Sequence, residues 1–172
     1  GAPRAITTGA QNLPDSFWSR DHRLCYQVGQ AFEDLQQWDS AAAYYRRAGD
    51  LMPRHPDYLL KLGAAWLAAR DTTRAGPLFR KMLRRYPHLP QVHNNLAFLA
   101  LLRFDLPQAE LRLEEALRLN PDYPEAFINW AKYHLGRQDL QRADQALERA
   151  RKLRPNDPAV RRLQQLIRRA SR

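Results

Sequence analysis

The stretch "KLRPNDPAV" at residues 152–160 carries two prolines separated by two residues, and the same spacing occurs three more times upstream. The earlier copies are "RLNPDYPEA" at residues 118–126, "RRYPHLPQV" at 84–92 and "DLMPRHPDY" at 50–58. Each copy follows the previous one by 34 residues, without drift. A fixed period of this length indicates a stacked-repeat architecture, in which each repeat is one supersecondary unit.

The Pro-x-x-Pro pattern predicts a joint between one helical hairpin and the next. The first proline ends a helix, because proline lacks a backbone N–H and constrains the residue before it. The second proline suits the first turn of the following helix, where the missing N–H is harmless. Asp57 and Glu125 then fall in first turns, where the helix dipole favours acids. A polyproline ligand for an SH3-type domain is the rival interpretation, and it does not explain the small residues that share the same register.

Small residues recur at two places of each unit when the units start at His22, Pro56, Pro90 and Pro124. The eighth residue is Gly29, Gly63, Ala97 and Ala131, and the twentieth is Ala41, Ala75, Ala109 and Ala143. Side chains this small let two antiparallel helices approach closely. An aspartate at the sixteenth place suits the N-cap of the second helix: Asp71, Asp105 and Asp139. The first unit departs from this pattern with Gln37.

These positions closely resemble the tetratricopeptide repeat, a helix–turn–helix of 34 residues, over about residues 22–157. The resemblance implies an all-α fold, a right-handed superhelical solenoid of antiparallel helix pairs. We expect a tail at residues 1–14 and a repeat region at 15–157, in which Phe17 and Trp18 form a lid. The expected units are about residues 22–55, 56–89, 90–123 and 124–157, and a capping helix is expected at 158–172.

Catalytic chemistry is not indicated by the sequence. Five histidines occupy unrelated places of the repeats, and there is no glycine-rich phosphate loop. The single cysteine, Cys25, excludes an internal disulfide and any CxxC metal site. Cys25 and His22 share a helix face, but the fourth place of a repeat is normally a core position, so we expect Cys25 to be a small buried residue. We therefore expect no enzyme activity, no metal and no cofactor.

The resemblance implies that the first helix of each unit lines a concave groove that binds a peptide or helix of a partner protein. The predicted groove residues occupy the fifth, sixth, ninth and twelfth places of these helices: Tyr26, Gln27, Gln30, Leu60, Lys61, Ala64, Leu67, Asn94, Asn95, Phe98, Leu101, Ile128, Asn129 and Lys132. The apolar members would take apolar side chains of the ligand, since an exposed apolar patch usually marks a partner site.

Asn95 and Asn129 carry the finer part of this prediction. In related repeats, an asparagine at the sixth place bonds to the backbone of an extended peptide. An amide can satisfy an N–H or a C=O whatever the ligand sequence, because it is both donor and acceptor. The alternative is that these amides bond only to neighbouring helices. Lys132 would favour an acidic residue in the ligand, whereas Lys61 interrupts the row of amides.

The net charge of +10 is uneven, because residues 140–172 hold ten Arg or Lys and only three Asp or Glu. An alternative function is therefore binding of nucleic acid or an anionic membrane surface through the basic C-terminal third. Arginine on a solvated helix face is the simpler interpretation. Nucleic acid is disfavoured because aromatic stacking platforms are sparse near that end.

Other features bear on the source of the chain and its compartment. No apolar run approaches about 18 residues, so we expect no transmembrane helix. The chain begins with Gly1, without Met or an apolar signal segment, which is typical of a processed chain or a fragment of a larger protein. The excess of arginine over lysine, 24 against 4, is compatible with a GC-rich bacterial source. We therefore expect a bacterial cytoplasmic or periplasmic protein, either an adaptor or one domain of a larger assembly.

Overall fold

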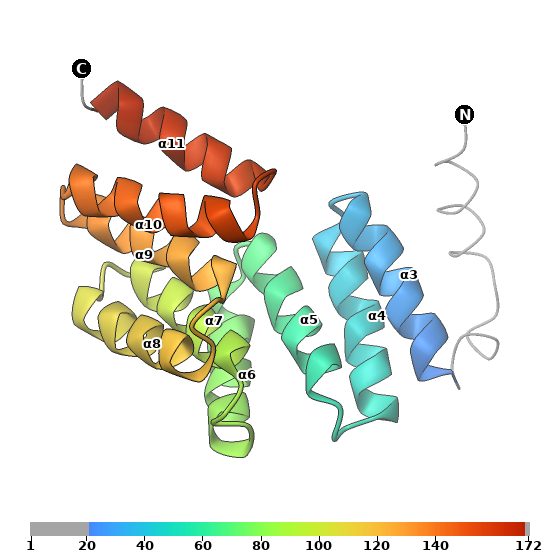
Figure 1. Cartoon of the computed structure of the whole chain (residues 1–172). Coiled ribbons are helices and arrows are strands. Elements are labelled where there is room, and N and C mark those ends of the chain that lie inside the picture. Colours follow the sequence, from blue (N-terminus) through green and yellow to red (C-terminus); the bar gives the residue numbers. More distant parts are fainter. Residues whose placement is uncertain (1–20, 171–172) are drawn as a thin grey trace, which may run out of the picture. The chain divides into compact units, whose positions relative to one another are not determined.

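The computed structural model describes residues 21–170, and these residues form nine α-helices and no strand (Figure 1). The helices are α3 (His22–Asp34), α4 (Trp38–Leu51), α5 (Pro56–Ala68), α6 (Thr72–Arg85), α7 (Pro90–Leu102), α8 (Leu106–Leu119), α9 (Pro124–Gly136), α10 (Leu140–Leu153) and α11 (Pro158–Ala170). The all-α prediction is confirmed. The predicted tail at residues 1–14 and the lid residues Phe17 and Trp18 lie outside the described residues.

Proline starts four of these helices, as the repeat predicts. Pro56, Pro90, Pro124 and Pro158 are the first residues of α5, α7, α9 and α11. The fixed φ of proline suits this position, and the helix loses no hydrogen bond there because the first N–H groups have no partner within the helix. The Pro-x-x-Pro pattern therefore acts as the joint between helical hairpins.

Aspartates cap the second helices of three hairpins. The Asp71 carboxylate accepts a hydrogen bond from the backbone N–H of Arg74 at 2.9 Å. Asp105 and Asp139 accept equivalent bonds at the starts of α8 and α10, at 3.2 and 3.0 Å. Gln37 makes no such side-chain bond before α4. The departure of the first unit from the aspartate pattern is thus seen in the structure as a missing cap.

The turn inside each hairpin places one residue in the left-handed region of φ. These residues recur every 34 positions and none is glycine: Gln36, Arg70, Phe104 and Gln138, with φ of 56°, 64°, 55° and 60°. This conformation ends the first helix, which lets the chain turn sharply into the second. A residue with a Cβ adopts it at a cost in conformational energy.

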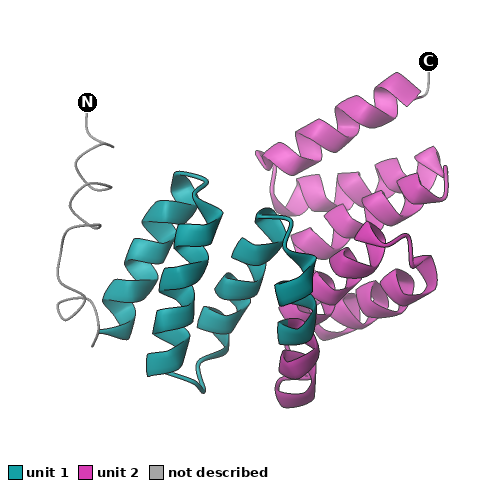
Figure 2. Cartoon of the chain, turned by 180° about the vertical axis from the view of Figure 1, so that it is seen from behind, with its two compact units in different colours: residues 1–78 teal, residues 79–172 magenta. Residues whose placement is uncertain are grey.

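The chain divides into two compact units, the first ending at Leu78 and the second beginning at Phe79 (Figure 2). In the first unit, α4 packs against both α3 and α5. Gly29 on α3 packs directly against the ring of Tyr45 on α4. A Cβ added there would lie 2.7 Å from Cε1 of Tyr45, whose side chain is fully buried. The Tyr45 ring therefore leaves no room for a side chain at position 29.

In the second unit, α7 pairs with α8, and α9 pairs with α10. The first helices of successive repeats also contact one another, because α9 packs against α7 on one side and α11 on the other. Fully buried alanines lie at the helix contacts: Ala97, Ala109, Ala116, Ala131 and Ala143. Leu113 and Leu147 fill the space beside them. This packing holds α7, α9 and α11 as neighbours along one side of the unit.

Candidate functional site

Lys61 is one of the predicted groove residues of the first unit. A neighbouring carboxylate already compensates its positive charge. The Lys61 ammonium lies 3.0 Å from both carboxylate oxygens of Glu33. Glu33 also accepts a short hydrogen bond from the hydroxyl of Tyr45. Burial raises the pKa of Tyr45, and the bond to Glu33 raises it further, so the phenol stays a donor. Lys61 is therefore held by this unit and is not offered as a free cation.

Tyr26 lies in a cluster of aromatic rings on the same unit. Its ring centroid is 5.6 Å from that of Tyr45 and 5.3 Å from that of Tyr58. Nδ1 of His22 is hydrogen-bonded to the Tyr58 hydroxyl at 2.6 Å, and the His55 ring stacks on Tyr58. These contacts join α3 to α5. Tyr26 thus contributes to packing in this unit, although part of its surface remains exposed.

The remaining predicted residues of the first unit differ in exposure. Gln27, Gln30 and Ala64 are exposed, and Leu60 is half-buried. Leu67 is buried, with 7% of its surface exposed. Leu67 was expected to take an apolar side chain of a ligand, and its burial leaves little surface for that contact.

In the second unit, three predicted residues form one chain of hydrogen bonds. The Asn129 amide Nδ2 donates to Oδ1 of Asn94 at 2.8 Å. The Asn129 Oδ1 in turn accepts from Nζ of Lys132 at 2.9 Å. Asn94 and Asn129 are both only 5% exposed. The buried amide pair therefore joins α7 to α9, and the bond from Lys132 to Asn129 fixes the position of the lysine side chain. We call Asn94, Phe98, Asn129 and Lys132 the Lys132 site.

Lys132 differs from Lys61 in having no carboxylate partner among the described residues. Its ammonium lies 4.5 Å from the centroid of the Phe98 ring, which is within range of a cation–π interaction. The side chain is half-buried. Burial disfavours the charged form and lowers the pKa of Lys132 to about 8. The ammonium keeps donor capacity beyond the single bond to Asn129, because it has three N–H donors.

The predicted groove residues of the second unit differ in exposure. Asn95, Phe98 and Leu101 on α7 are half-buried. The Asn95 side chain forms no hydrogen bond with a described residue, so its amide is available to a ligand. Ile128 is 6% exposed and packs with Ala150 and Val160 in the core. Ile128 was expected to line the groove, but its side chain is buried where α9, α10 and α11 pack together.

The two asparagines of the predicted amide row therefore have different surroundings. The Asn95 amide forms no hydrogen bond with a described residue, whereas the Asn129 amide is bonded to Asn94 of the neighbouring helix. Binding of a ligand backbone by Asn95 stays a prediction. Sequence reasoning did not single out Asn94 or Glu33 as bonding partners, because they come from different helices. The pairs occupy different places of their repeats, fifth and sixth for Asn94 and Asn129 and twelfth and sixth for Glu33 and Lys61, so the 34-residue register does not indicate them.

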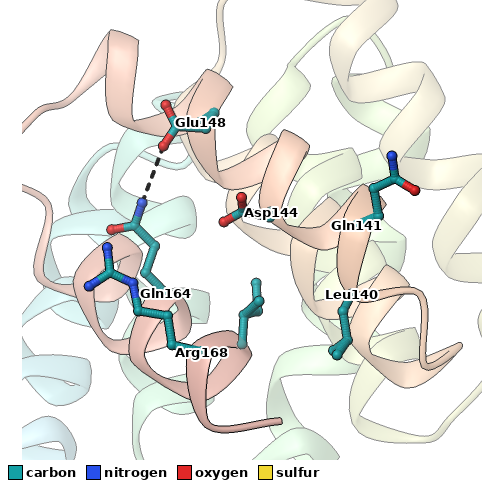
Figure 3. Close-up of a pocket in the computed structure, with 7 residues that line it drawn as sticks. Leu140, Gln141, Asp144, Glu148, Gln164 and Arg168 are labelled. Carbon is teal, nitrogen blue, oxygen red and sulfur yellow. Dashed lines mark hydrogen bonds between the residues drawn. The ribbon is translucent and has the colours of Figure 1, made fainter. Parts of the chain in front are cut away.

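A depression lies between α10 and α11 (Figure 3). Its lining comes from α10 and α11: Leu140, Gln141, Asp144, Glu148, Gln164, Ile167 and Arg168. The Glu148 carboxylate accepts bonds from Gln164 at 3.4 Å and from Arg151 at 2.7 Å. Acidic and basic groups are mixed here, so this depression does not select one sign of charge.

Within residues 21–170, no group of three or more His, Cys, Asp or Glu side chains is placed to hold a metal ion. None of the described helices combines the length and the apolar character that a membrane crossing requires. Cys25 is fully buried, and burial raises the pKa of its thiol.

Two family models of the tetratricopeptide repeat match the chain, one at residues 26–90 and the other at residues 100–167. Together they cover most of the chain. A comparison with curated proteins finds no match. Proteins built from these repeats are generally non-enzymatic scaffolds for interactions between proteins, and the chain has the corresponding all-α repeat solenoid fold.

Solved structures of repeat proteins have the same fold. A thermophilic tetratricopeptide repeat protein of Thermus thermophilus is 19% identical, with a TM-score of 0.78 over 86% of this chain and 81% of that one. MamA of Desulfovibrio magneticus is 17% identical, with a TM-score of 0.62 over 91% and 86% of the two chains. YrrB, a repeat protein with an unusual peptide-binding site, is 13% identical, with a TM-score of 0.59 over 84% and 74%. At these identities the likeness concerns the fold.

Proposed function

We propose that this chain, which belongs to the tetratricopeptide repeat family, binds a segment of a partner protein on the face of α7 and α9. The segment carries an acidic side chain that pairs with Lys132. The binding is non-enzymatic, since its elements are an ammonium, an amide and an apolar surface. This function makes the chain an adaptor between proteins.

One observation carries the proposal, namely the uncompensated charge of Lys132. A half-buried ammonium without a counter-ion is unfavourable in the free protein, and the lowered pKa reflects that. A ligand carboxylate would supply the missing counter-ion. The bond from Lys132 to Asn129, and from Asn129 to Asn94, holds the ammonium in place before the ligand arrives. Such preorganisation reduces the entropy lost on binding.

Neighbouring residues would supply the remaining contacts. The free amide of Asn95 can bond to an N–H or a C=O of the ligand backbone. Phe98 offers apolar surface beside the ammonium, and Leu101 on the same helix is also half-buried. In such interfaces a few residues carry most of the binding energy, and a charge against an aromatic ring is a suitable anchor. We therefore assign the main contribution to Lys132 and Phe98.

A random-peptide display library, selected against the folded protein, tests this proposal, because the selection does not require the partner to be identified first. The wild-type protein should enrich peptides with Asp or Glu at one position and an apolar residue nearby. Lys132→Gln should lose that enrichment, because glutamine keeps a polar side chain but removes the charge. A matched control is Lys152→Gln, which removes one exposed charge elsewhere.

The result depends on the comparison between the two variants. If Lys132→Gln enriches the same acidic peptides as the wild type, the proposed site is wrong. If both variants lose the enrichment equally, the selection reflects net charge and again the proposal fails. Circular dichroism should show equal helicity for all three proteins, because neither substitution removes a helix contact of the core.

A further inference from the structure

The helix α11 presents two parallel stripes of arginine, one on each side of its buried face. Val160, Leu163 and Ile167 form the buried face and pack on α9 and α10. Because a helix turns through about 100° per residue, residues spaced by three, four and seven fall in one stripe. One stripe contains Arg162, Leu166 and Arg169, and the other contains Arg161, Gln164 and Arg168.

The second stripe, Arg161, Gln164 and Arg168, faces α10, and this fixes the direction in which each stripe points. Gln164 and Arg168 line the depression against α10, as Figure 3 shows. The first stripe lies on the other side of the buried face of α11. The first stripe continues back to Ala159, seven residues before Leu166, and Ala159 packs against the cluster that contains Ile128 of α9, so this stripe begins at the contact with α9. Leu166 occupies the ninth place of its unit, which is the place of Phe98 in α7 and of Lys132 in α9.

The first stripe combines an exposed apolar side chain with two unpaired charges. Leu166 is 53% exposed, which makes it one of the most exposed large apolar residues of the described chain. Arg162 and Arg169 are exposed, and neither forms an ion pair with a described residue. The nearby acids Glu125 and Asp157 are both engaged by Arg154, at 2.6 and 3.9 Å. The side of α9 and α11 therefore presents positive charge around an apolar centre.

We infer that α11 extends the Lys132 site, and that the partner segment is an acidic stretch of protein with one large apolar side chain. This inference rests on the proposed function. Leu166 receives the apolar side chain, while Arg162 and Arg169 pair with flanking carboxylates, and Lys132 pairs with a further carboxylate. Charge complementarity favours an acidic occupant, because Lys132, Arg162 and Arg169 form no ion pair with an acidic side chain among the described residues. The apolar centre favours a protein segment over a uniform polyanion.

The test measures binding of a capped synthetic peptide, EELEE, labelled with a fluorophore, to the folded protein by anisotropy. The double variant Arg162→Gln with Arg169→Gln should weaken binding by about tenfold, since it removes two charge pairs at the rim. Leu166→Ser should weaken the binding of EELEE by about fivefold, because it removes the contact to the leucine of the peptide. The peptide EEAEE lacks that leucine, so it should bind the wild type more weakly than EELEE does, and Leu166→Ser should not change its affinity. The peptide QQLQQ should bind far more weakly than EELEE.

The other stripe provides the matched control. Arg161→Gln with Arg168→Gln removes the same charge from the same helix, but on the flank against α10. This variant should bind EELEE like the wild type. Equal weakening by both double variants would show unspecific attraction and overturn the inference. If neither weakens binding while Lys132→Gln abolishes it, α11 is not part of the site, although the proposed function stands.

Three further outcomes oppose the inference. If the wild type does not bind EELEE, or if Lys132→Gln binds it as well as the wild type does, then both the inference and the proposed function fail. Labelled single-stranded uridylate RNA and vesicles with phosphatidylserine serve as alternative probes. If either binds more tightly than EELEE, with a steep salt dependence and equal sensitivity to both arginine stripes, the surface is a general polyanion site.

Discussion

Asn129 and Lys132 lie one turn apart on α9, and the amide oxygen of the asparagine accepts a hydrogen bond from the ammonium of the lysine at 2.9 Å. The same amide donates to Asn94 on α7 at 2.8 Å. This arrangement gives Asn129 a structural part in the site, distinct from that of its counterpart Asn95. The difference between these two asparagines leads to the first prediction.

Asn129→Ala should destabilise the protein by about 1–3 kcal/mol, because it leaves the buried Asn94 amide without its donor. Asn95→Ala should change the free energy of unfolding by less than about 0.5 kcal/mol, since that side chain is half-buried and unbonded. Chemical denaturation of the two variants measures both values. Equal stabilities of the two variants would contradict the bonding seen for Asn129.

Binding of an acidic peptide should weaken as the pH rises above about 8. The free protein holds Lys132 with a pKa of about 8, because burial disfavours the charged form. The ligand binds the protonated form, so its affinity should fall by up to about tenfold per pH unit above that pKa. The affinity should stop falling once the pH exceeds the pKa of Lys132 in the complex, which the paired carboxylate raises above that of the free protein. Anisotropy titrations with EELEE between pH 7 and pH 10 measure this dependence.

Lys132→Arg is the control for the pH dependence, because a guanidinium stays charged over this range. Affinity for the peptide should then be flat up to pH 10. The same lysine predicts a stability effect of opposite sign. Its pKa in the folded state lies below the unfolded value of 10.5, so the unfolded state binds more protons between pH 8 and pH 10. The wild type should therefore gain stability relative to Lys132→Met as the pH rises through this window.

Gly29→Ala should destabilise the first unit by about 1–3 kcal/mol through overpacking. The new Cβ would lie 2.7 Å from Cε1 of Tyr45, and that ring is fully buried and bonded to Glu33. Gly136→Ala is the control, because its Cβ would meet Cδ2 of Leu106 at an ordinary 3.5 Å. The control should be neutral or slightly stabilising. Thermal unfolding of both variants, followed by circular dichroism, gives the comparison.

Phe104→Gly should stabilise the protein by about 0.5–1 kcal/mol. Phe104 adopts a φ of 55° and is 80% exposed, so the substitution relieves backbone strain and removes little buried surface. Denaturant midpoints of the wild type and the variant measure the effect. Phe104→Ala is the control, since alanine removes the ring but keeps the Cβ. A glycine variant no more stable than the alanine variant would show that φ at this turn is not strained.

Much of the fold could be predicted from the sequence because its determinants are local. Proline at the first helical position, aspartate before the second helix and alanine at the helix contacts each act within a few residues or within one hairpin. Their recurrence at 34 residues therefore identified the helices and their starts. The missing side-chain cap before α4 could be predicted as well, because it depends on a single residue, Gln37 in place of aspartate.

The candidate site was less predictable, because its chemistry depends on partners brought together by packing. Lys61 and Lys132 are both lysines on first helices, and the sequence does not distinguish a paired lysine from a free one. Glu33 compensates the first from α3, at 3.0 Å, whereas Lys132 meets only an amide and an aromatic ring among the described residues. Burial likewise separates Asn129 from Asn95.

The sequence by itself determined the all-α repeat and the register of its helices, since capping, chain reversal and close helix contact need only local residue types. Tertiary structure alone decided which charge is left uncompensated. Electrostatic energy depends on distance and on burial, and both arise when side chains from different helices meet. That is why Lys132, Phe98 and Asn129 form a site only in the folded chain.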